Sequence, residues 1–123
     1  MSISEYFTNM CETAKETGKP VSNGEWYAYR AWSNTEDYKA EMFEAVEIPW
    51  GSDLKNGTMV DFVNALKNAG VTEFAVTDHS TALMEGIYAL VTAGCSIKGP
   101  AVVKRHPAYW GDEEHIGLIF TIN

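Results

Sequence analysis

Apolar residues near the start of this chain recur at the three- and four-residue spacing of a helix. The repeating positions are Ile3, Phe7, Met10, Cys11 and Ala14. This spacing predicts an amphipathic helix of about four turns. Ser2 and Glu5 have the spacing of a capping box at its beginning, and Gly18-Lys19-Pro20 is typical of its end.

The next stretch is harder to assign from its pattern. Residues 25–32 are rich in aromatic side chains and fit either a strand or a helix. Ser33 and Glu36 again have capping-box spacing, so we expect a helix from Ser33 to about Glu44. Residues 45–48 fit a short strand or the tail of that helix, and Pro49 ends either one.

Two further helices are predicted on either side of a short strand. After a loop over 50–57, Thr58 and Asp61 are typical of a capped helix, which Gly70 ends. Residues 74–76 predict a strand. The helix that follows, at about 79–93, is apolar nearly all round. We therefore expect Tyr88 and Leu90, on opposite sides of it, both to be buried.

The last part of the chain predicts a hairpin. Residues 101–103 and 116–122 resemble strands, and a polar loop over 107–114 separates them. The expected fold is α/β or α+β, with a single small sheet that includes this hairpin and is covered by three to four helices. No repeat or linker divides the chain, so residues 1–123 are expected to form a single globular domain.

The net charge of the chain limits the classes of partner that it can bind. The formal net charge is −8, with seventeen acidic residues against nine basic ones, which argues against direct nucleic-acid binding. Seven of the acids fall within residues 36–61. A solvated surface explains such a cluster in most proteins. The functional alternative is docking on a basic partner protein, with Glu41, Glu44 and Glu47 as contacts.

One aromatic residue is a further candidate for partner binding. Trp110 lies between Pro107 and Gly111 on the predicted hairpin loop, where packing in a core is hardest to arrange. Tryptophan is favoured in protein interfaces. We therefore expect Trp110 to contact a partner.

Several other functions find no support in the sequence. The apolar stretches are too short to span a bilayer and no signal segment opens the chain, so a cytoplasmic protein with reduced Cys11 and Cys95 is expected. The histidines and cysteines have no metal-ligand spacing. Glycine-rich phosphate loops are absent. We predict no metal and no cofactor.

The polar run Asp78-His79-Ser80-Thr81 joins the strand at 74–76 to the helix after it. Ligands are often held at such junctions, because the first N–H groups of a helix lack partners. A serine nucleophile needs a base about 3 Å away, whereas consecutive side chains at a helix start point about 100° apart. We therefore assign no catalytic residue. We expect Asp78 or Ser80 to cap the helix, with ligand binding by Asp78, His79, Ser80 and Thr81 as the alternative.

The second half of the chain resembles a known group of proteins. The segments that carry the resemblance are Val60 to Gly70, Thr77-Asp78-His79-Ser80-Thr81-Ala82-Leu83-Met84, Ala93-Gly94-Cys95 with Gly99, and Trp110-Gly111 before Gly117-Leu118. They are similar to a family of small uncharacterised proteins of gut Firmicutes and their mobile elements. The most specific part is Thr-Asp-x-Ser-Thr-Ala-Leu-Met. The resemblance implies a genomic setting and no activity. By analogy, small acidic proteins of mobile elements often inhibit host defence systems or act as small regulators.

These observations favour a small acidic, non-enzymatic interaction protein that binds a protein partner. One form of it would be a mobile-element-encoded inhibitor of a host defence system such as CRISPR. The alternative is a small-molecule-binding or enzymatic domain with its site at Asp78–Thr81. A deep pocket there would favour the alternative, and a shallow surface with one acidic face would favour the interaction protein. The sequence predicts no particular oligomeric state.

Overall fold

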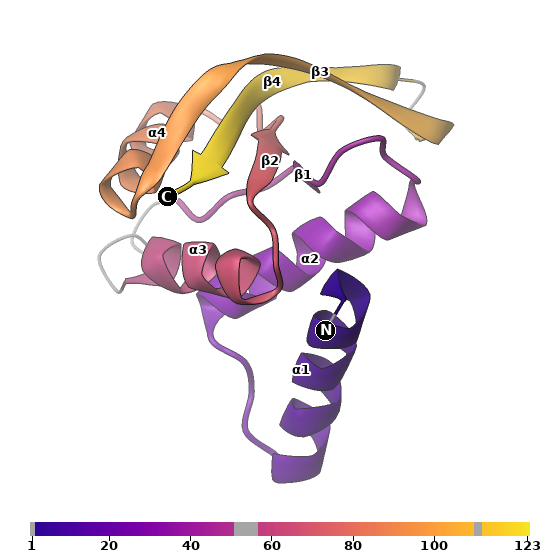
Figure 1. The fold of residues 1–123 in the computed structure, drawn as a ribbon, viewed down its shortest axis with the longest axis vertical. Helices are drawn as coiled ribbons and strands as arrows, with labels where there is room; N and C mark the ends of the chain where they lie inside the picture. The colour runs from indigo at the N-terminus through magenta and orange to yellow at the C-terminus, as the bar shows by residue number, and fades with distance from the viewer. Residues whose placement is uncertain (1, 51–56, 110–111) are drawn as a thin grey trace.

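The computed structural model describes residues 2–50, 57–109 and 112–123, which form helices and one sheet (Figure 1). In chain order the elements are α1 (Ile3–Thr17), α2 (Asn23–Asp37), β1 (Glu44–Ala45), α3 (Thr58–Asn68), β2 (Glu73–Val76), α4 (Leu83–Thr92), β3 (Cys95–Tyr109) and β4 (Asp112–Ile122). The α+β fold expected from the sequence is confirmed. No helix in the described ranges is long and apolar enough to cross a bilayer.

The sheet has the strand order β1-β2-β4-β3. β1 is parallel to β2, whereas β4 is antiparallel to both β2 and β3. The predicted C-terminal hairpin is confirmed, but its strands are longer than expected. β3 continues to Tyr109 and β4 begins at Asp112, so the loop expected over 107–114 is largely strand. Pairing resumes at Tyr109 and Asp112 after a register shift beyond Lys104, so the two strands remain paired close to the turn.

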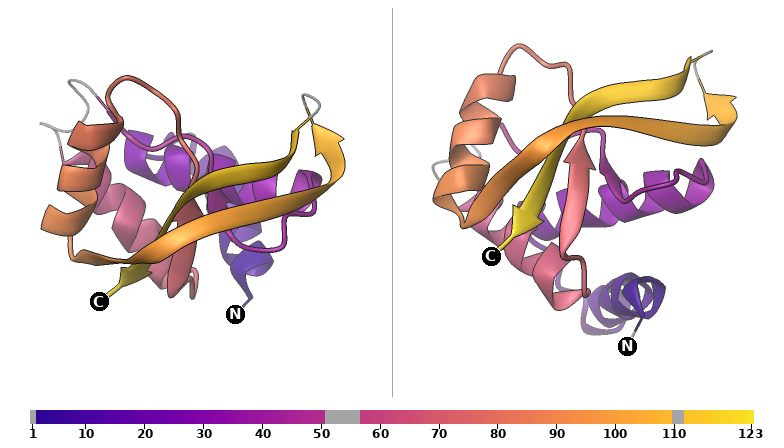
Figure 2. Two further views of the ribbon diagram at one scale, coloured as in Figure 1. Left: turned by 90° about the horizontal axis from the view of Figure 1, so that it is seen from above. Right: turned by 45° about the horizontal axis from the view of Figure 1, so that its top comes forward.

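The β3–β4 hairpin curves across the rest of the sheet (Figures 1 and 2). β3 has two register shifts, between Ile97 and Gly99 and between Lys104 and Tyr109. Bulges of this kind bend a strand and increase its twist. The far part of β3 thereby reaches the segment before β1, where the Glu41 N–H donates to the Lys104 carbonyl at 3.0 Å. The two edges of the sheet therefore approach each other across its concave face.

The helix α1 agrees with its prediction. The Ser2 hydroxyl accepts a hydrogen bond from the Glu5 N–H at 3.1 Å. Gly18, with φ of 70°, ends the helix, and its N–H donates to the Ala14 carbonyl. The capping-box spacing and the glycine stop therefore mark both ends correctly.

The helix α2 corrects two expectations. Residues 25–32 are helical, and the helix ends at Asp37 instead of beginning at Ser33. The capping box is formed by Ser22 and Glu25, whose N–H groups each donate to the other side chain, at 3.0 and 3.3 Å. The second Ser-x-x-Glu lies inside α2, because the helix has already begun at Asn23 and packs through a stripe of small residues that precedes Ser33. That buried stripe consists of Gly24, Ala28 and Ala31.

The helix α3 begins one residue earlier than expected and without the predicted side-chain cap. Thr58 is its first residue, and the preceding Gly57, with φ of 73°, makes no side-chain cap. α3 packs closely on α2 at Gly24. A Cβ on Gly24 would lie 2.4 Å from the Thr58 carbonyl oxygen and 2.7 Å from the Phe62 nitrogen. Glycine is therefore required where the two helices meet.

The two faces of the sheet bury different side chains. Alternate residues of a strand point to opposite faces, so Phe74 and Val76 face the helices while Ala75 faces the concave side. The helix side holds the main core, whose largest fully buried side chains are Phe7, Ile48, Phe62, Leu66, Phe74, Leu90 and Phe120. The concave side holds a smaller core of Ala75, Ala101 and Val103. Charged side chains are buried beside this second core, as described below.

Candidate functional site

Asp78 holds the loop between β2 and α4 in place instead of capping the helix. Its carboxylate accepts the Ser80 N–H at 2.7 Å through Oδ1 and the Ile48 N–H at 3.1 Å through Oδ2. α4 begins only at Leu83, after Ala82, and has no side-chain cap. The prediction that Asp78 or Ser80 caps this helix is therefore wrong. The buried carboxylate bonds its own loop and the segment after β1, and the helix starts beyond that loop.

The other predicted ligand contacts lie on the surface of the same loop. His79, Ser80 and Thr81 are exposed. Within the part of the chain that the structure describes, no hydrogen bond joins the His79 ring to either hydroxyl. A serine or threonine nucleophile needs such a base. The loop therefore offers no catalytic pair in this conformation.

A groove of about 450 Å³, the α4 groove, lies between α4 and the β3–β4 hairpin, with the β2–α4 loop at one side. Its lining is mostly apolar and consists chiefly of Val76, Leu83, Ile87, Pro100, Val102, Ile116, Leu118 and Phe120. Asp78 and His79 also line it. Val102 and Ile116 are paired across the hairpin and are 56% and 66% exposed. The groove therefore has apolar walls that remain open to solvent.

A glycine allows the strands to meet in the lining of this groove. A Cβ on Gly117 would lie 2.0 Å from the Val76 carbonyl oxygen and 3.1 Å from the Thr77 Cα. No side chain fits at that separation, since the neighbouring atoms belong to the backbone. Gly117 is therefore needed for β4 to pass the end of β2, which sets the shape of the groove.

The helix α4 is buried on one side only. Leu90 is fully buried, but Tyr88 is 75% exposed, so the prediction that both are buried is wrong. Met84 and Val91 are exposed as well, and the spacing of the three residues places them on one side of the helix. The apolar composition reflects one side packed on the core and a second apolar side facing solvent.

Glu44 belongs to a buried charge cluster and not to an acidic surface. Arg105 Nε donates to its Oε1 at 2.6 Å, His115 Nδ1 lies 2.8 Å from its Oε2, and the Thr77 hydroxyl donates to Oε2. The Arg105 guanidinium also lies over the ring of Tyr38, 5.1 Å from its centroid. Since Glu44 is fully buried, its predicted contact with a partner is wrong: β1 directs it into the concave side of the sheet.

The environment of Glu44 keeps it ionised. Burial acts to raise the pKa of the Glu44 carboxyl, because a charge is costly away from water. Hydrogen bonds from Arg105, Thr77 and His115, together with the Arg105 charge, act in the other direction and hold the pKa below its ordinary value. The cluster is therefore a carboxylate held by three donors from distant parts of the chain.

Sequence reasoning missed Thr77, Arg105 and His115 as partners of Glu44. One signal was present, because Arg105 continues the two-residue alternation of the buried Ala101 and Val103 along β3. An arginine at an inward position requires a buried acid beside it. Over the described residues, no three histidine, cysteine, aspartate or glutamate side chains come together as metal ligands.

Two of the three acidic residues predicted to contact a partner lie on the surface. Glu41 and Glu47 are exposed, and the Glu47 carboxylate lies 3.5 Å from Arg30 Nη1. They remain predicted contacts of a basic partner. Trp110 lies outside the described residues.

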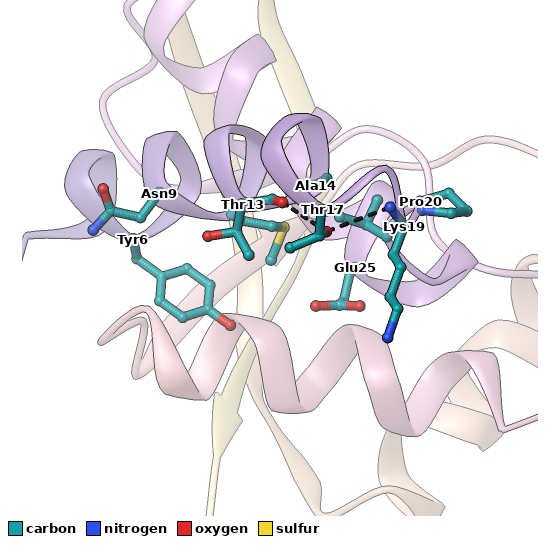
Figure 3. Close-up of a pocket in the computed structure, with 10 residues that line it drawn as sticks. Tyr6, Asn9, Thr13, Ala14, Thr17, Lys19, Pro20 and Glu25 are labelled. Atoms are coloured by element: carbon teal, nitrogen blue, oxygen red, sulfur yellow. Dashed lines mark hydrogen bonds between the residues drawn. The ribbon is translucent and has the colours of Figure 1, made fainter.

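A further hollow lies beside α1 and the segment after it (Figure 3). Its volume is about 510 Å³, and two of its polar side chains, those of Thr17 and Glu25, are engaged within the chain. The Thr17 hydroxyl donates to the Thr13 carbonyl at 2.8 Å and accepts the Lys19 N–H at 3.4 Å. The Glu25 carboxylate takes part in the capping box of α2. This hollow therefore offers less to a ligand than its size suggests.

Residues 27–120 match the family model described as "Domain of unknown function (DUF7698)". The chain belongs to this family. The membership is consistent with the uncharacterised family expected from the sequence, and the match reaches back beyond Val60 to Tyr27. The α4 groove and the Glu44 cluster lie within the DUF7698 match, whereas the residues lining the hollow beside α1 end at Glu25. No curated protein and no solved structure matches the chain.

Proposed function

We propose that this protein is a non-enzymatic interaction protein that binds an apolar segment of a partner protein in the α4 groove. The observation that carries the proposal is the exposure of Val102 and Ile116 in the groove lining, at 56% and 66%. Covering apolar surface contributes about 25 cal/mol per Å², so an apolar segment seated there gains free energy. Contiguous exposed apolar patches commonly mark interaction sites.

The polar groups near the groove favour a protein partner over a polar substrate. Both carboxylate oxygens of Asp78 already accept backbone N–H groups. The one charged residue of α4 is Glu85, and the chain as a whole carries a net charge of −8. We therefore propose a partner segment that is apolar at its centre and basic at its ends, since opposite charge speeds association.

The edge of the sheet disfavours binding by addition of a strand. β3 is an edge strand, and unpaired edges can pair with another chain. However, Pro100 has no N–H to donate, and the register shift between Ile97 and Gly99 distorts the edge. The partner is therefore proposed to dock through side chains in the groove.

A narrower form of the proposal is a mobile-element-encoded inhibitor of a host defence system such as CRISPR. The acidic charge and the resemblance described above support it. Exposed Glu41 and Glu47 would then contribute to a basic partner's binding surface, and buried Glu44 would not.

Site-specific photo-crosslinking tests the proposed groove. A photoreactive amino acid replaces Val102, and a control replaces Val60, which is 50% exposed on α3 and does not line the groove. We expect a partner from the source organism to crosslink at position 102 and not at 60. The double variant Val102→Glu/Ile116→Glu should lose that partner, whereas Val60→Glu should retain it. Equal binding by both variants would contradict the proposal.

A small apolar ligand is a second candidate for the same groove. Its volume of about 450 Å³ falls within the range of ligand pockets, and it touches Asp78 and His79. Native mass spectrometry of the purified protein separates the two candidates. A bound small molecule that disappears in Val102→Glu/Ile116→Glu, with no protein crosslinked at position 102, would establish this second function in place of the first.

A further inference from the structure

A second cavity lies beside the buried charge cluster, on the other side of the sheet from the α4 groove. It has a volume of about 290 Å³ and is formed by α2, the segment after β1, and the β3–β4 hairpin. The polar and charged side chains in its lining are Arg30, Asn34, Tyr38, Glu47, Arg105 and His115. Two guanidinium groups, an imidazole and one carboxylate, that of Glu47, thus line one small space in a chain of net charge −8.

Arg105 has more hydrogen-bond donors than the cluster uses. Its Nε donates to Glu44, whose two oxygens also receive Thr77 and His115. Arg105 is 5% exposed, and its Nη2 is sealed from solvent. Among the residues described, no atom accepts a hydrogen bond from Nη2. A buried donor without a partner carries a free-energy cost, which is removed if the guanidinium turns toward an acceptor in the cavity that Arg105 lines.

Other groups around the cavity also suit an acceptor. The Arg30 side chain is 43% exposed and only 3.5 Å from Glu47 at its nearest nitrogen, so it can reorient. Asn34 adds an amide. Guanidinium groups recognise carboxylate and phosphate oxygens by paired hydrogen bonds.

We propose that this cavity binds a small oxyanion, the phosphate or carboxylate group of a small molecule. The anion would lie between Arg30 and Arg105 and accept from the Asn34 amide. Its size is limited by the cavity, which has room for roughly ten water-sized groups. The site is separate from the α4 groove, so the proposal stands independently of the partner.

Nuclear magnetic resonance titration tests the proposal. The wild-type protein is titrated with inorganic phosphate and, separately, with acetate, at a constant ionic strength set by chloride. We expect saturable shifts in the backbone amides of Asn34, Glu47 and His115. Saturation with phosphate alone or acetate alone would assign the class of oxyanion, and saturation with both would support the shared chemistry. Shifts with neither, or shifts confined to other regions, would overturn the proposal.

Variants at the rim of the cavity add a second test that leaves the buried cluster intact. Arg30→Gln/Asn34→Ala should weaken anion binding by about tenfold or more, because a charged hydrogen-bond donor is lost. Lys15→Gln in α1 removes the same charge far from the cavity and should bind as the wild type does. Circular dichroism establishes that both variants are folded. Equal weakening in both would show a general charge effect and overturn the site, and the wild-type shift map stands if the double variant unfolds.

Discussion

The α4 groove and the Glu44 cluster depart from the usual distribution of side chains in opposite directions. The groove exposes large apolar side chains, Val102 and Ile116, whereas the cluster buries charged ones, Glu44 and Arg105. Exposed apolar groups contribute little to folding, but buried charges must be compensated inside the protein. The groove is therefore available for binding, whereas the cluster is tied to the fold.

The two regions also differ in what they join. One carboxylate, Glu44 on β1, bonds Arg105 on β3, His115 on β4 and Thr77 just after β2. It therefore ties the curved hairpin to the opposite edge of the sheet. The groove residues Val102 and Ile116 pair with each other across one hairpin. Changes in the cluster should lower the free energy of unfolding, and changes in the groove should lower it far less.

Glu44→Gln is expected to have the largest effect on stability. Glutamine keeps the shape of the side chain but leaves Arg105 buried without a counter-charge. Breaking a buried ion pair in this way typically costs about 3–5 kcal/mol. Urea denaturation measures the free energy of unfolding, with Glu41→Gln as an exposed control that should stay within about 0.5 kcal/mol of wild type. Equal stability of the two variants would show that the cluster does not hold the sheet.

The pH dependence of that difference sharpens the same test. Because the folded-state pKa of Glu44 lies below its ordinary value of 4.5, its contribution is present above that value and is lost as the pH falls through the folded pKa. The stability gap between wild type and Glu44→Gln should therefore be constant near neutral pH and shrink in acid. Denaturation midpoints measured from neutral pH down to acid would show this. A gap that grows in acid would contradict the lowered pKa.

Asp78→Ala is expected to have the next largest effect. The buried Ile48 N–H would lose its acceptor, which costs about 1–3 kcal/mol. Ser80→Ala is the matched control, because its hydrogen bond to Asp78 uses the backbone N–H and should persist. Circular dichroism should show unchanged helix content in Asp78→Ala. A selective loss of helix would instead support the capping role that the sequence suggested.

Asp78 illustrates where sequence reasoning succeeded and where it could not. The strand at 74–76, the first helix and the C-terminal hairpin follow from local periodicity and capping residues, and the structure confirms them. The second partner of Asp78, the Ile48 N–H, lies thirty residues away. A short-range pattern indicates that a carboxylate needs donors but not which distant donors it receives.

The predictions of helix boundaries and of buried helix faces failed for a related reason. Two Ser-x-x-Glu sequences could each begin a helix, at Ser22 and Ser33; the first forms the capping box, and the packing of Gly24 on α3 favours that start. The apolar residues of α4 fit burial all round, but the core covers one side only. The sequence pattern placed Glu44 on an acidic surface, whereas in the structure the β3–β4 hairpin covers it. In each case the deciding contact is long-range.

Val102→Glu/Ile116→Glu should change stability far less than Glu44→Gln does. Both side chains are more than half exposed, and strand preferences among residues differ by about 1 kcal/mol at most. Urea denaturation should therefore place the double variant within about 1–2 kcal/mol of wild type. A loss as large as that of Glu44→Gln would mean that the groove residues support the fold and that the contrast between the two regions is wrong.

The labelling rates of the two cysteines are expected to show the smallest effect, and they probe the same difference between the groove and the cluster. Cys11 is exposed, whereas Cys95 is buried at the start of β3, and burial raises its thiol pKa to about 11. Since the thiolate is the reactive form, a thiol reagent at neutral pH should label Cys11 quickly and Cys95 only when the protein opens. Peptide mass spectrometry assigns each label.

Labelling of Cys95 should accelerate in Glu44→Gln, because destabilisation populates open forms. In Val102→Glu/Ile116→Glu the rate should remain close to that of wild type. Equal acceleration in both variants would show that the groove and the cluster are coupled through β3, and that the binding surface is not independent of the fold.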